Sequence, residues 1–239
     1  MKPYAFQKKI LPEYPRTLHL PHKPNADRTD VVATPEDAKV IFERPTCVQE
    51  KIDGSNCGMA LVDGEAIIRN REFILAKGFN NRKDTPAKQQ FATVFTWFYE
   101  NKKRFEKLNK IIPNCSVFGE WMIAQHGLEY DLLPDWFVPY DLYDYETEHF
   151  INPVTATQAL TEAGFVPVPL VYQGIIKSYD DLEALCNAPS PFTTKGNREG
   201  VYLKVSDEWN VTHRFKMVRA DFVRGALWSD EKITKNKLA

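Results

Sequence analysis

The sequence predicts an α+β fold, in which antiparallel strands and helices are interspersed along the chain. Three observations support this class. Asp63-Gly64 lies between the apolar runs GMALV and EAIIRN, which is the strongest short signal for a β-hairpin. Apolar residues over 87–111 recur mostly at three- and four-residue steps, which is typical of an amphipathic helix. Near the C-terminus, EGVYLKVS and NVTHRFKMV have the composition of two further strands.

The first 45 residues differ from the rest of the chain. They are rich in proline and have few periodic apolar residues, so we expect an extended N-terminal segment on the domain surface. From Thr46 the pattern changes to strands, beginning with CVQEKI. The long helix over 87–111 follows the hairpin, with Thr85 as its N-cap, Pro86 in its first turn and Pro113 after its end.

The second half of the chain alternates strands and short helices. Strands are predicted at CSVFGEWMI and WFVPYDLYDY. Asn152 and Gly164 mark the start and the end of a helix over 153–163. Ser178 is the expected cap of a short helix that runs through Cys186. The run FVPVPLVYQG is interrupted by proline, which predicts an edge strand or a linker.

The composition excludes several classes of protein. The net charge is −1, from 31 basic and 32 acidic residues, so any polyanion site must be a local concentration of cations. No run of 18 apolar residues is present, and we expect no membrane span. The four cysteines lack CxxC spacing and no signal peptide is visible, which predicts free thiols and a cytoplasmic location. The histidines show no zinc-like spacing.

The stretch EKIDGSN, residues 50–56, is the first candidate for chemistry. It is either a strand that ends in a polar turn or a nucleophilic lysine beside a ligand-binding turn. Gln49, Lys51 and Asp53 share one face of the strand, and Gly54 lets the backbone approach a ligand. A neutral Lys51 amine at about pH 7.5 requires its pKa to fall from about 10.4, at a cost of about 4 kcal/mol. Neighbouring cations can lower it, so the nucleophile hypothesis predicts cations that converge on Lys51.

The sequence offers such cations at the ends of several strands. They are Arg69 and Arg71 in IIRNREF, Lys204 in EGVYLK, and Arg214 and Lys216 in VTHRFKMV. In the last segment the two cations alternate with apolar residues, which places both on one face of the strand. A half-buried edge strand has the same pattern, so each of these signals is weak when taken alone.

Two carboxylates stand out in the same way. Glu120 lies inside the apolar strand VFGEWM, where an unpaired buried carboxylate is costly unless it binds a metal or a ligand hydroxyl. Glu199 begins the strand that Lys204 ends. Residues five apart face opposite sides of a regular strand, so we expect a bulge or strong twist between these two.

Taken together and in order, the motifs EKIDGSN, RNREF, FGEW, EGVYLK and RFK resemble those of the covalent nucleotidyltransferases. This superfamily contains ATP-dependent RNA ligases, DNA ligases and mRNA capping enzymes, and the chain is most similar to the phage-type RNA ligases. The resemblance runs from about residue 14 to residue 222. It implies a nucleotidyltransferase fold, the adenylation fold of DNA and RNA ligases (ATP-grasp-like), with antiparallel sheets flanked by helices.

The resemblance assigns the phosphate chemistry to five residues. Lys51 would attack the α-phosphate of ATP and form a lysyl–AMP phosphoramidate. Lys204, Arg214 and Lys216 would contact the α-phosphate, and Glu199 would help to place a divalent metal, Mg²⁺ or Mn²⁺. Many relatives have lysine where this chain has Arg214, whose planar charged group can still hold phosphate.

The resemblance also assigns residues to the nucleoside. Asn56 would contact the ribose or the end being joined, and Arg71 the phosphate or ribose. Glu120 would bind a ribose hydroxyl, and Tyr140 would stack on adenine. Backbone contacts to the adenine edge are implied for Glu50 and Ile52. The GSN sequence after the lysine is more similar to RNA ligases than to DNA ligases.

The expected organisation is a single adenylyltransferase domain over 1–239, with 1–45 as its extended N-terminal segment. The chain ends 23 residues after Lys216, so no C-terminal OB domain is expected. The expected partners are RNA ends, a 5′-phosphate and a 3′-hydroxyl, and we expect a monomer in the cytoplasm, the host cytoplasm if the chain is phage-encoded. A partner protein or a missing domain is an alternative source of substrate binding.

Two alternatives stay open. The chain could be a DNA ligase or capping-type nucleotidyltransferase, although GSN and the lack of an OB domain argue against both. It could also be a non-catalytic nucleotide- or RNA-binding module of the same fold. The role of the upstream stretch YPRTLHLP is open as well, because it could hold substrate or pack on the domain.

Overall fold

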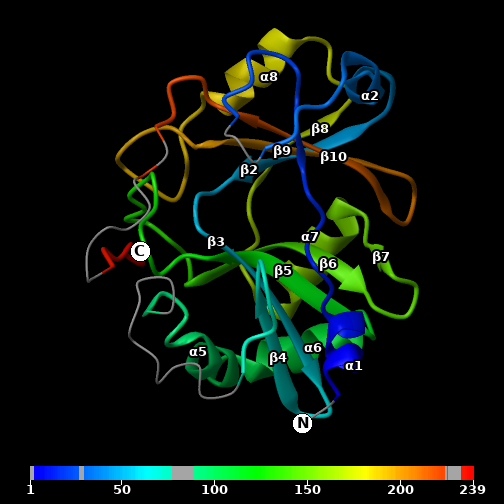
Figure 1. Cartoon of the computed structure of the whole chain (residues 1–239), viewed down its shortest axis with the longest axis vertical. Helices are drawn as coiled ribbons and strands as arrows, with labels where there is room; N and C mark the ends of the chain where they lie inside the picture. Colours follow the sequence, from blue (N-terminus) through cyan, green and yellow to red (C-terminus); the bar gives the residue numbers. More distant parts are fainter. Residues whose placement is uncertain (1–2, 27–29, 77–88, 224, 226–232) are drawn as a thin grey trace.

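Two five-stranded sheets form the framework of the protein (Figure 1). The computed structural model describes residues 3–26, 30–76, 89–223, 225 and 233–239. Sheet A has the strand order β1-β10-β9-β2-β8, and sheet B has the order β4-β3-β5-β6-β7. Within the described residues, neighbouring strands are antiparallel except for β1 and β10, which are parallel. The predicted α+β class is confirmed.

The described elements have the following bounds. The strands are β1 (Leu18–His19), β2 (Thr46–Lys51), β3 (Ser55–Val62), β4 (Glu65–Asn70), β5 (Cys115–Trp121), β6 (Phe137–Asp144), β7 (His149–Phe150), β8 (Leu170–Gly174), β9 (Gly200–Ser206) and β10 (Val211–Val218). The helices are α1 (Tyr4–Ile10), α2 (Pro35–Ala38), α3 (Val40–Glu43), α5 (Val94–Glu100), α6 (Lys102–Ile111), α7 (Pro153–Ala163) and α8 (Tyr179–Cys186).

Sheet A buries one face and turns the other toward sheet B. Alternate residues of a strand point to opposite faces, and Val201 and Leu203 of β9 are buried in a core that includes Leu182 of α8. Tyr202 and Lys204 therefore point the other way, toward sheet B. Figure 1 shows α8 and α2 on the outer side of sheet A. The functional side chains of this sheet thus face the interior of the molecule.

Sheet B packs against helices α5, α6 and α7 through an aromatic core. The rings of Phe98 and Phe105 stack at 4.3 Å between centroids, and Trp97 meets Trp121 of β5 at 5.9 Å. These residues are buried in one cluster with Phe137 of β6. Burial of large aromatic side chains is a major source of stability in a domain core. Sheet B is therefore a rigid platform for the residues on its other face.

The single helix predicted over 87–111 is wrong. Two helices, α5 and α6, meet at Asn101, whose backbone (φ −102°, ψ 11°) is not helical. The Asn101 amide Nδ2 donates to the Trp97 carbonyl at 2.9 Å and so ends α5. The apolar period continues across this break because both helices bury residues in the same core. The predicted cap at Thr85 and Pro86 lies outside the described residues.

The N-terminal segment is also less extended than predicted. It contains α1, β1, α2 and α3. Thr34 caps α2 through a capping box with Asp37, and Pro35 lies in the first turn. The sequence Thr-Pro-Glu-Asp carries this signal. The stretch between α1 and β1 is the extended part, and it runs from the side of sheet B to sheet A (Figure 1).

Several local predictions are confirmed. Asp63 and Gly64 both have positive φ (49° and 79°), as a two-residue hairpin turn requires, and they join β3 to β4. Asn152 caps α7, and Gly164 ends it in the left-handed conformation. Ser178 caps α8. The second half of the proline-interrupted run forms β8, which is an edge strand of sheet A.

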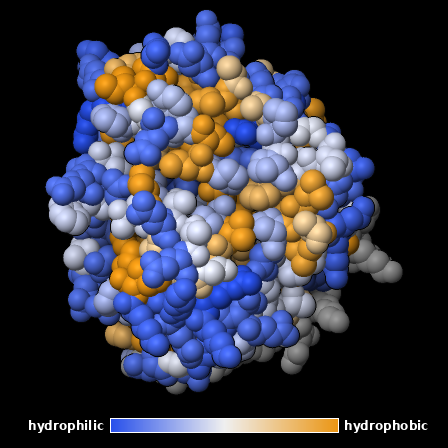
Figure 2. All heavy atoms as spheres, turned by 180° about the vertical axis from the view of Figure 1, so that it is seen from behind, coloured by the Kyte–Doolittle hydropathy of each residue, from blue (hydrophilic) through white to orange (hydrophobic). Residues whose placement is uncertain are grey.

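The surface has no single broad apolar face in the view from behind. Figure 2 shows hydrophobic atoms in several patches among hydrophilic ones. Within the described residues, every helix is too short or too polar to cross a bilayer. The four cysteines are buried and unpaired, as the sequence predicts.

Candidate active site

Lys51 lies at the end of β2, directly opposite Gly200 of β9. Its ammonium Nζ donates to Glu199 Oε2 at 2.5 Å and lies 5.5 Å from the centre of the Tyr202 ring. The side chains of Lys51 and Glu199 are 14% and 4% exposed. The expected bulge between Glu199 and Lys204 does not occur, because Glu199 precedes the strand and β9 pairs with β2 in regular register. Glu199 can therefore turn to Lys51 without any irregularity.

The electrostatics around Lys51 differ from the sequence prediction. Burial alone would lower the pKa of Lys51, but Glu199, Tyr202 and Asp53 outweigh it and raise this pKa. Burial also raises the pKa of Glu199 to about 7, while Lys51 opposes that rise. The lowered pKa that the nucleophile hypothesis requires is therefore not found at Lys51 in this structure. The hydrogen-bond partner of Lys51 is the acidic Glu199, whereas the predicted cations Lys204 and Arg214 contact Asp141.

The turn after Lys51 is held by protein contacts. Asp53 Oδ2 accepts hydrogen bonds from the backbone N–H groups of Gly127 at 2.5 Å and Leu128 at 3.2 Å. A Cβ on Gly54 would lie 2.5 Å from the Met122 sulfur and 3.1 Å from the backbone oxygen of Trp121. Gly54 is thus required by a close approach to β5 and the loop after it, and we find no need to invoke a ligand.

A cavity beside Lys51 gathers residues from both sheets and from the N-terminal segment. We call it the site cavity. Five predicted site residues line it: Asn56, Arg71, Glu120, Tyr140 and Lys216. The other lining residues are Tyr14, Pro15, Arg16, Thr17, Asp30, Val31 and Tyr202. Its volume is about 60 Å³. These five predictions, which are spread over 160 residues of sequence, therefore converge on one place.

Two buried acceptors in this cavity have no partner within the described residues. Asn56 of β3 and Glu120 of β5 face each other as a cross-strand pair. The Asn56 Nδ2 donates to the Tyr140 hydroxyl at 2.5 Å, which leaves Asn56 Oδ1 and Glu120 Oε2 without hydrogen bonds. Burial raises the pKa of Glu120 to about 8. Unpaired buried acceptors are costly, so this pair is suited to a ligand that brings hydrogen-bond donors.

Tyr202 is a cavity residue that the sequence analysis missed. Its ring centre lies 6.4 Å from that of Tyr140, and the two rings are tilted by 43°. Tyr202 comes from sheet A and Tyr140 from sheet B. The signal was present in EGVYLK, because residues two apart share a strand face and Tyr202 lies two positions before Lys204.

Lys204 and Arg214 do not line the cavity, and both contact the buried Asp141 instead. Lys204 Nζ donates to Asp141 Oδ1 at 2.7 Å, to Gln49 Oε1 at 2.6 Å and to the Tyr140 carbonyl at 3.0 Å. An ammonium has three donors, so all of them are used within the protein. Arg214 Nη2 lies 3.6 Å from Asp141 Oδ2. Their contact with the α-phosphate therefore stays a prediction, which would require these contacts to rearrange.

The sequence analysis did not single out Asp141, although its pattern is the same as that of Glu120. It is a carboxylate within the apolar strand around Tyr140, and it is fully buried. Lys204 and Arg214 of sheet A therefore neutralise a carboxylate of sheet B. This ionic cluster ties the two sheets together beside the cavity.

Glu50 of β2 and Ile52, which directly follows the strand, alternate with Lys51 and so point away from it. Ile52 is 2% exposed and packs in the core beside Phe118. The backbone N–H of Glu50 donates to the Pro169 carbonyl at 3.1 Å. Burial raises the pKa of the Glu50 carboxyl. A backbone contact from these two residues to adenine stays a prediction, and the Glu50 N–H is already occupied.

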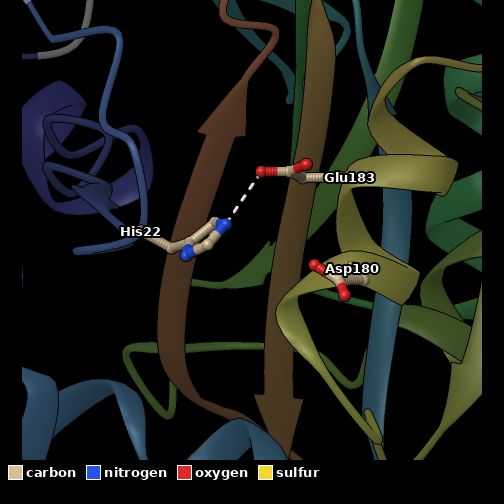
Figure 3. Close-up of side chains that lie close together, drawn as sticks. All are labelled: His22, Asp180 and Glu183. Carbon is tan, nitrogen blue, oxygen red and sulfur yellow. Dashed lines mark hydrogen bonds and ion pairs between the residues drawn. The ribbon is translucent and has the colours of Figure 1, made fainter.

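One other cluster has the residue types of a metal site, but its contacts argue against that role. His22, Asp180 and Glu183 lie together at α8 (Figure 3). Glu183 Oε1 is 2.8 Å from His22 Nε2 and also 2.8 Å from Lys23 Nζ. The lysine already neutralises the only carboxylate oxygen that His22 contacts. Within the described residues, Glu199 stays the better candidate ligand, because its carboxylate adjoins Lys51.

The fold and the site define the class of protein. Two antiparallel sheets place a buried lysine, paired with a carboxylate, beside a cavity with unpaired acceptors. Naegleria gruberi RNA ligase has the same fold, with a TM-score of 0.60 and 18% identity for a mutant with ATP and Mn, over 92% of this chain and 62% of that one. The same ligase with PPi has a TM-score of 0.58 and 20% identity, over 84% and 57%.

The sequence itself matches the model of the RNA ligase family over residues 44–218. The chain belongs to the RNA ligase family. A mutant of the Naegleria gruberi enzyme with AMP and Mn gives a TM-score of 0.59 at 15% identity, over 88% of this chain and 56% of that chain. The chain thus spans little more than half the length of these solved structures. Among curated proteins, no sequence matches it.

Proposed function

We propose that this chain is an ATP-dependent RNA ligase that works through a lysyl–AMP intermediate on Lys51. The observation that carries this proposal is the position of Lys51, which is paired with Glu199 next to a cavity whose Asn56 and Glu120 have unpaired acceptors. The solved relatives that bind ATP or AMP with Mn support the choice of nucleotide and of a divalent metal, Mg²⁺ or Mn²⁺. The substrates would be an RNA 5′-phosphate and a 3′-hydroxyl.

The reaction has three balanced steps. In the first, the neutral Lys51 amine attacks the α-phosphorus of ATP, the bond to pyrophosphate breaks, and lysyl–AMP forms as the lysine nitrogen loses a proton. In the second, an oxygen of the RNA 5′-phosphate attacks this phosphorus, the P–N bond breaks, and the lysine regains a proton. In the third, the 3′-hydroxyl loses its proton and attacks the 5′-phosphorus, AMP leaves, and a phosphodiester remains.

Lys51 must lose its proton before the first step. Its pKa is raised by Glu199 in the free protein, whereas burial acts in the opposite direction. Separation of the Glu199 carboxylate from Lys51 would leave burial dominant and favour the neutral amine. Glu199 would hold the divalent metal, which when bound supplies charge neutralisation at the phosphates. The Glu199 carboxylate is buried, and oxygen is the donor that Mg²⁺ and Mn²⁺ prefer.

The nucleoside would occupy the site cavity. Glu120 Oε2 and Asn56 Oδ1 would accept hydrogen bonds from ribose hydroxyls or the adenine amino group. Tyr140 and Tyr202 provide aromatic walls on opposite sheets. Ligand pockets are commonly about 300 Å³ or larger. The cavity is smaller than this, so its side chains must move outward when ATP enters.

The decisive experiment detects the covalent adduct. The protein is incubated with ATP, GTP or NAD labelled in the adenylate or guanylate phosphate, with Mg²⁺ or Mn²⁺, and run on a denaturing gel. We expect an acid-labile adduct with ATP only, which is absent in Lys51→Ala and retained in the exposed loop variant Lys177→Ala. RNA with a 5′-phosphate and a 3′-hydroxyl should then be sealed, while the DNA equivalent should not.

The other outcomes identify the alternatives. A GTP adduct would indicate a capping-type enzyme, and efficient sealing of DNA would indicate a DNA ligase. A folded protein that forms no adduct under any of these conditions would contradict ligase activity and favour a nucleotide- or RNA-binding module.

A further inference from the structure

The stretch YPRTLHLP forms part of a strap that crosses the site cavity. Residues 11–21, which we call the strap, run from α1 beside sheet B to β1 in sheet A (Figure 1). At one end, Arg69 Nη1 donates to the Leu11 carbonyl at 3.1 Å. In the middle, the Tyr14 hydroxyl donates to Asp141 Oδ2 at 2.5 Å. These two contacts fix the first part of the strap to sheet B.

The other end of the strap lies next to Asp30, which contacts Lys216. β1 pairs in parallel with β10 and places His19 opposite Lys216. The backbone N–H of His19 donates to the Val31 carbonyl at 2.8 Å, which brings Asp30 and Val31 against the strap. Asp30 Oδ1 then accepts a hydrogen bond from Lys216 Nζ at 2.5 Å, and Asp30 Oδ2 lies 3.1 Å from His19 Nε2.

This contact differs from an ordinary surface ion pair. The side chains of Asp30 and Lys216 are each only 14% exposed, and His19 is 1% exposed. Exposed pairs are loosely held and contribute little, whereas this one is enclosed and fixed by backbone pairing. Asp30 and Lys216 both line the site cavity, together with Glu120 and Tyr140. The pair therefore lies within the candidate active site itself.

The geometry leaves Lys216 able to bind a further anion. A lysine ammonium has three N–H donors. Within the described residues, Lys216 Nζ donates only to Asp30, which leaves two donors for a ligand in the cavity. Lys204 is the contrast, because its three donors are all used by protein groups. Of these two lysines, Lys216 is the one prepared for phosphate.

We propose that Asp30, supported by His19, is a positioning residue that holds the Lys216 ammonium at the cavity wall for the α-phosphate of ATP. This inference rests on the proposed function, because it assigns Lys216 to the first step. Asp30 does not touch the reacting atoms and acts through Lys216. The carboxylate also offsets the repulsion between Lys216 and Lys51, which share the same enclosed region.

The test measures the first step in the full chain. Adenylation of Lys51 by ATP is followed under single-turnover conditions for wild type, Asp30→Asn, Asp30→Glu, Lys216→Ala and the double variant Asp30→Asn/Lys216→Ala. Glu43→Gln is the matched control, because Glu43 pairs with Lys39 on the exposed surface at 3.4 Å. Thermal melting of each variant separates loss of folding from loss of rate.

We expect Asp30→Asn to slow adenylation roughly 10- to 100-fold, mainly in the maximal rate, because displacement of the Lys216 ammonium from its position reduces the rate by about this factor. Asp30→Glu should recover part of the rate, and Glu43→Gln should match wild type. In the Lys216→Ala background, Asp30→Asn should cause no further loss, since both changes remove the same contact. A merely structural role would lower the melting temperature and add to the Lys216→Ala loss.

Each other result overturns the inference. A wild-type rate in Asp30→Asn, or additive losses in the double variant, would show that Asp30 does not act through Lys216. A faster rate would show that the carboxylate competes with phosphate. If Asp30→Asn does not fold, the same test uses Asp30→Glu in its place. The adenylation rates of Asp30→Glu and of the double variant Asp30→Glu/Lys216→Ala are then compared. Absence of an adduct in wild type would contradict the proposed function as well, whereas an adduct with an indifferent Asp30→Asn would contradict only this inference.

Discussion

Sheet A and sheet B contribute different chemistry to the same cavity. Sheet A, with the residue just before β9, supplies the charged groups Lys51, Glu199 and Lys216. Sheet B supplies the hydrogen-bonding pair Asn56 and Glu120, with the Tyr140 ring beside them. The difference teaches that the proposed phosphate chemistry and the proposed nucleoside recognition are built on separate platforms. Changes to one sheet should then alter the rate, and changes to the other should alter nucleotide affinity.

The largest expected effect comes from Lys204, which connects the two sheets. Lys204 belongs to sheet A, yet it donates to Asp141 and to the Tyr140 carbonyl of sheet B. Lys204→Met should lower the free energy of unfolding by about 3–5 kcal/mol, because it leaves a buried carboxylate short of a partner. Urea denaturation checks this, with the exposed Lys39→Met as control. A variant as stable as wild type would show that Lys204 is not a tie between the sheets.

Much of this arrangement could be predicted from the sequence. Turn and cap residues such as Asp63-Gly64 and Asn152 act locally, so their structures follow from their types. The convergence of Asn56, Glu120 and Lys216 was predicted as well, through the resemblance to a known family. Period-two alternation also indicated that Arg214 and Lys216 share one face of β10.

The rest could not be predicted because it depends on distant partners. The Asp30–Lys216 pair joins residues 186 apart, and it requires the parallel pairing of β1 with β10. The raised pKa of Lys51 could not be predicted either, because the Glu199 carboxylate that contacts it lies 148 residues away in the sequence. The break at Asn101 was hidden because the apolar period continues through it.

The next largest effect should come from Lys216, which represents sheet A. Lys216→Ala should lower kcat for adenylation by about 100-fold with little change in the KM for ATP, because a group aimed at the developing charge acts mainly in the transition state. Single-turnover rates over a range of ATP concentrations check this. A large rise in KM at unchanged kcat would place Lys216 in ground-state binding, and the division between the sheets would be lost.

Glu120, which represents sheet B, should show the opposite behaviour and a smaller effect. Glu120→Gln should raise the KM for ATP by roughly tenfold with kcat nearly unchanged, since it removes one acceptor for a ribose hydroxyl. Adenylation with 2′-deoxy-ATP and 3′-deoxy-ATP sharpens this test. The analogue that lacks the contacted hydroxyl should be used equally by wild type and variant. If the KM difference between wild type and Glu120→Gln is the same for both analogues as for ATP, Glu120 does not bind a ribose hydroxyl.

The smallest effect is on stability against pH in the free protein. Burial raises the pKa of Glu120 from 4.5 to about 8, so the folded state holds a proton that the unfolded state has lost. Its stabilising contribution is therefore complete below about pH 4.5 and is lost as the pH rises through about 8. Without divalent metal, wild type should lose stability between pH 5 and pH 8, and Glu120→Gln should lose less. Urea unfolding in EDTA across this range measures the difference. Glu199 affects the pH dependence in the same direction in both proteins, so it does not account for a difference between them. Parallel profiles of stability against pH would therefore show that Glu120 is already ionised and that its pocket in sheet B is more hydrated than its burial implies.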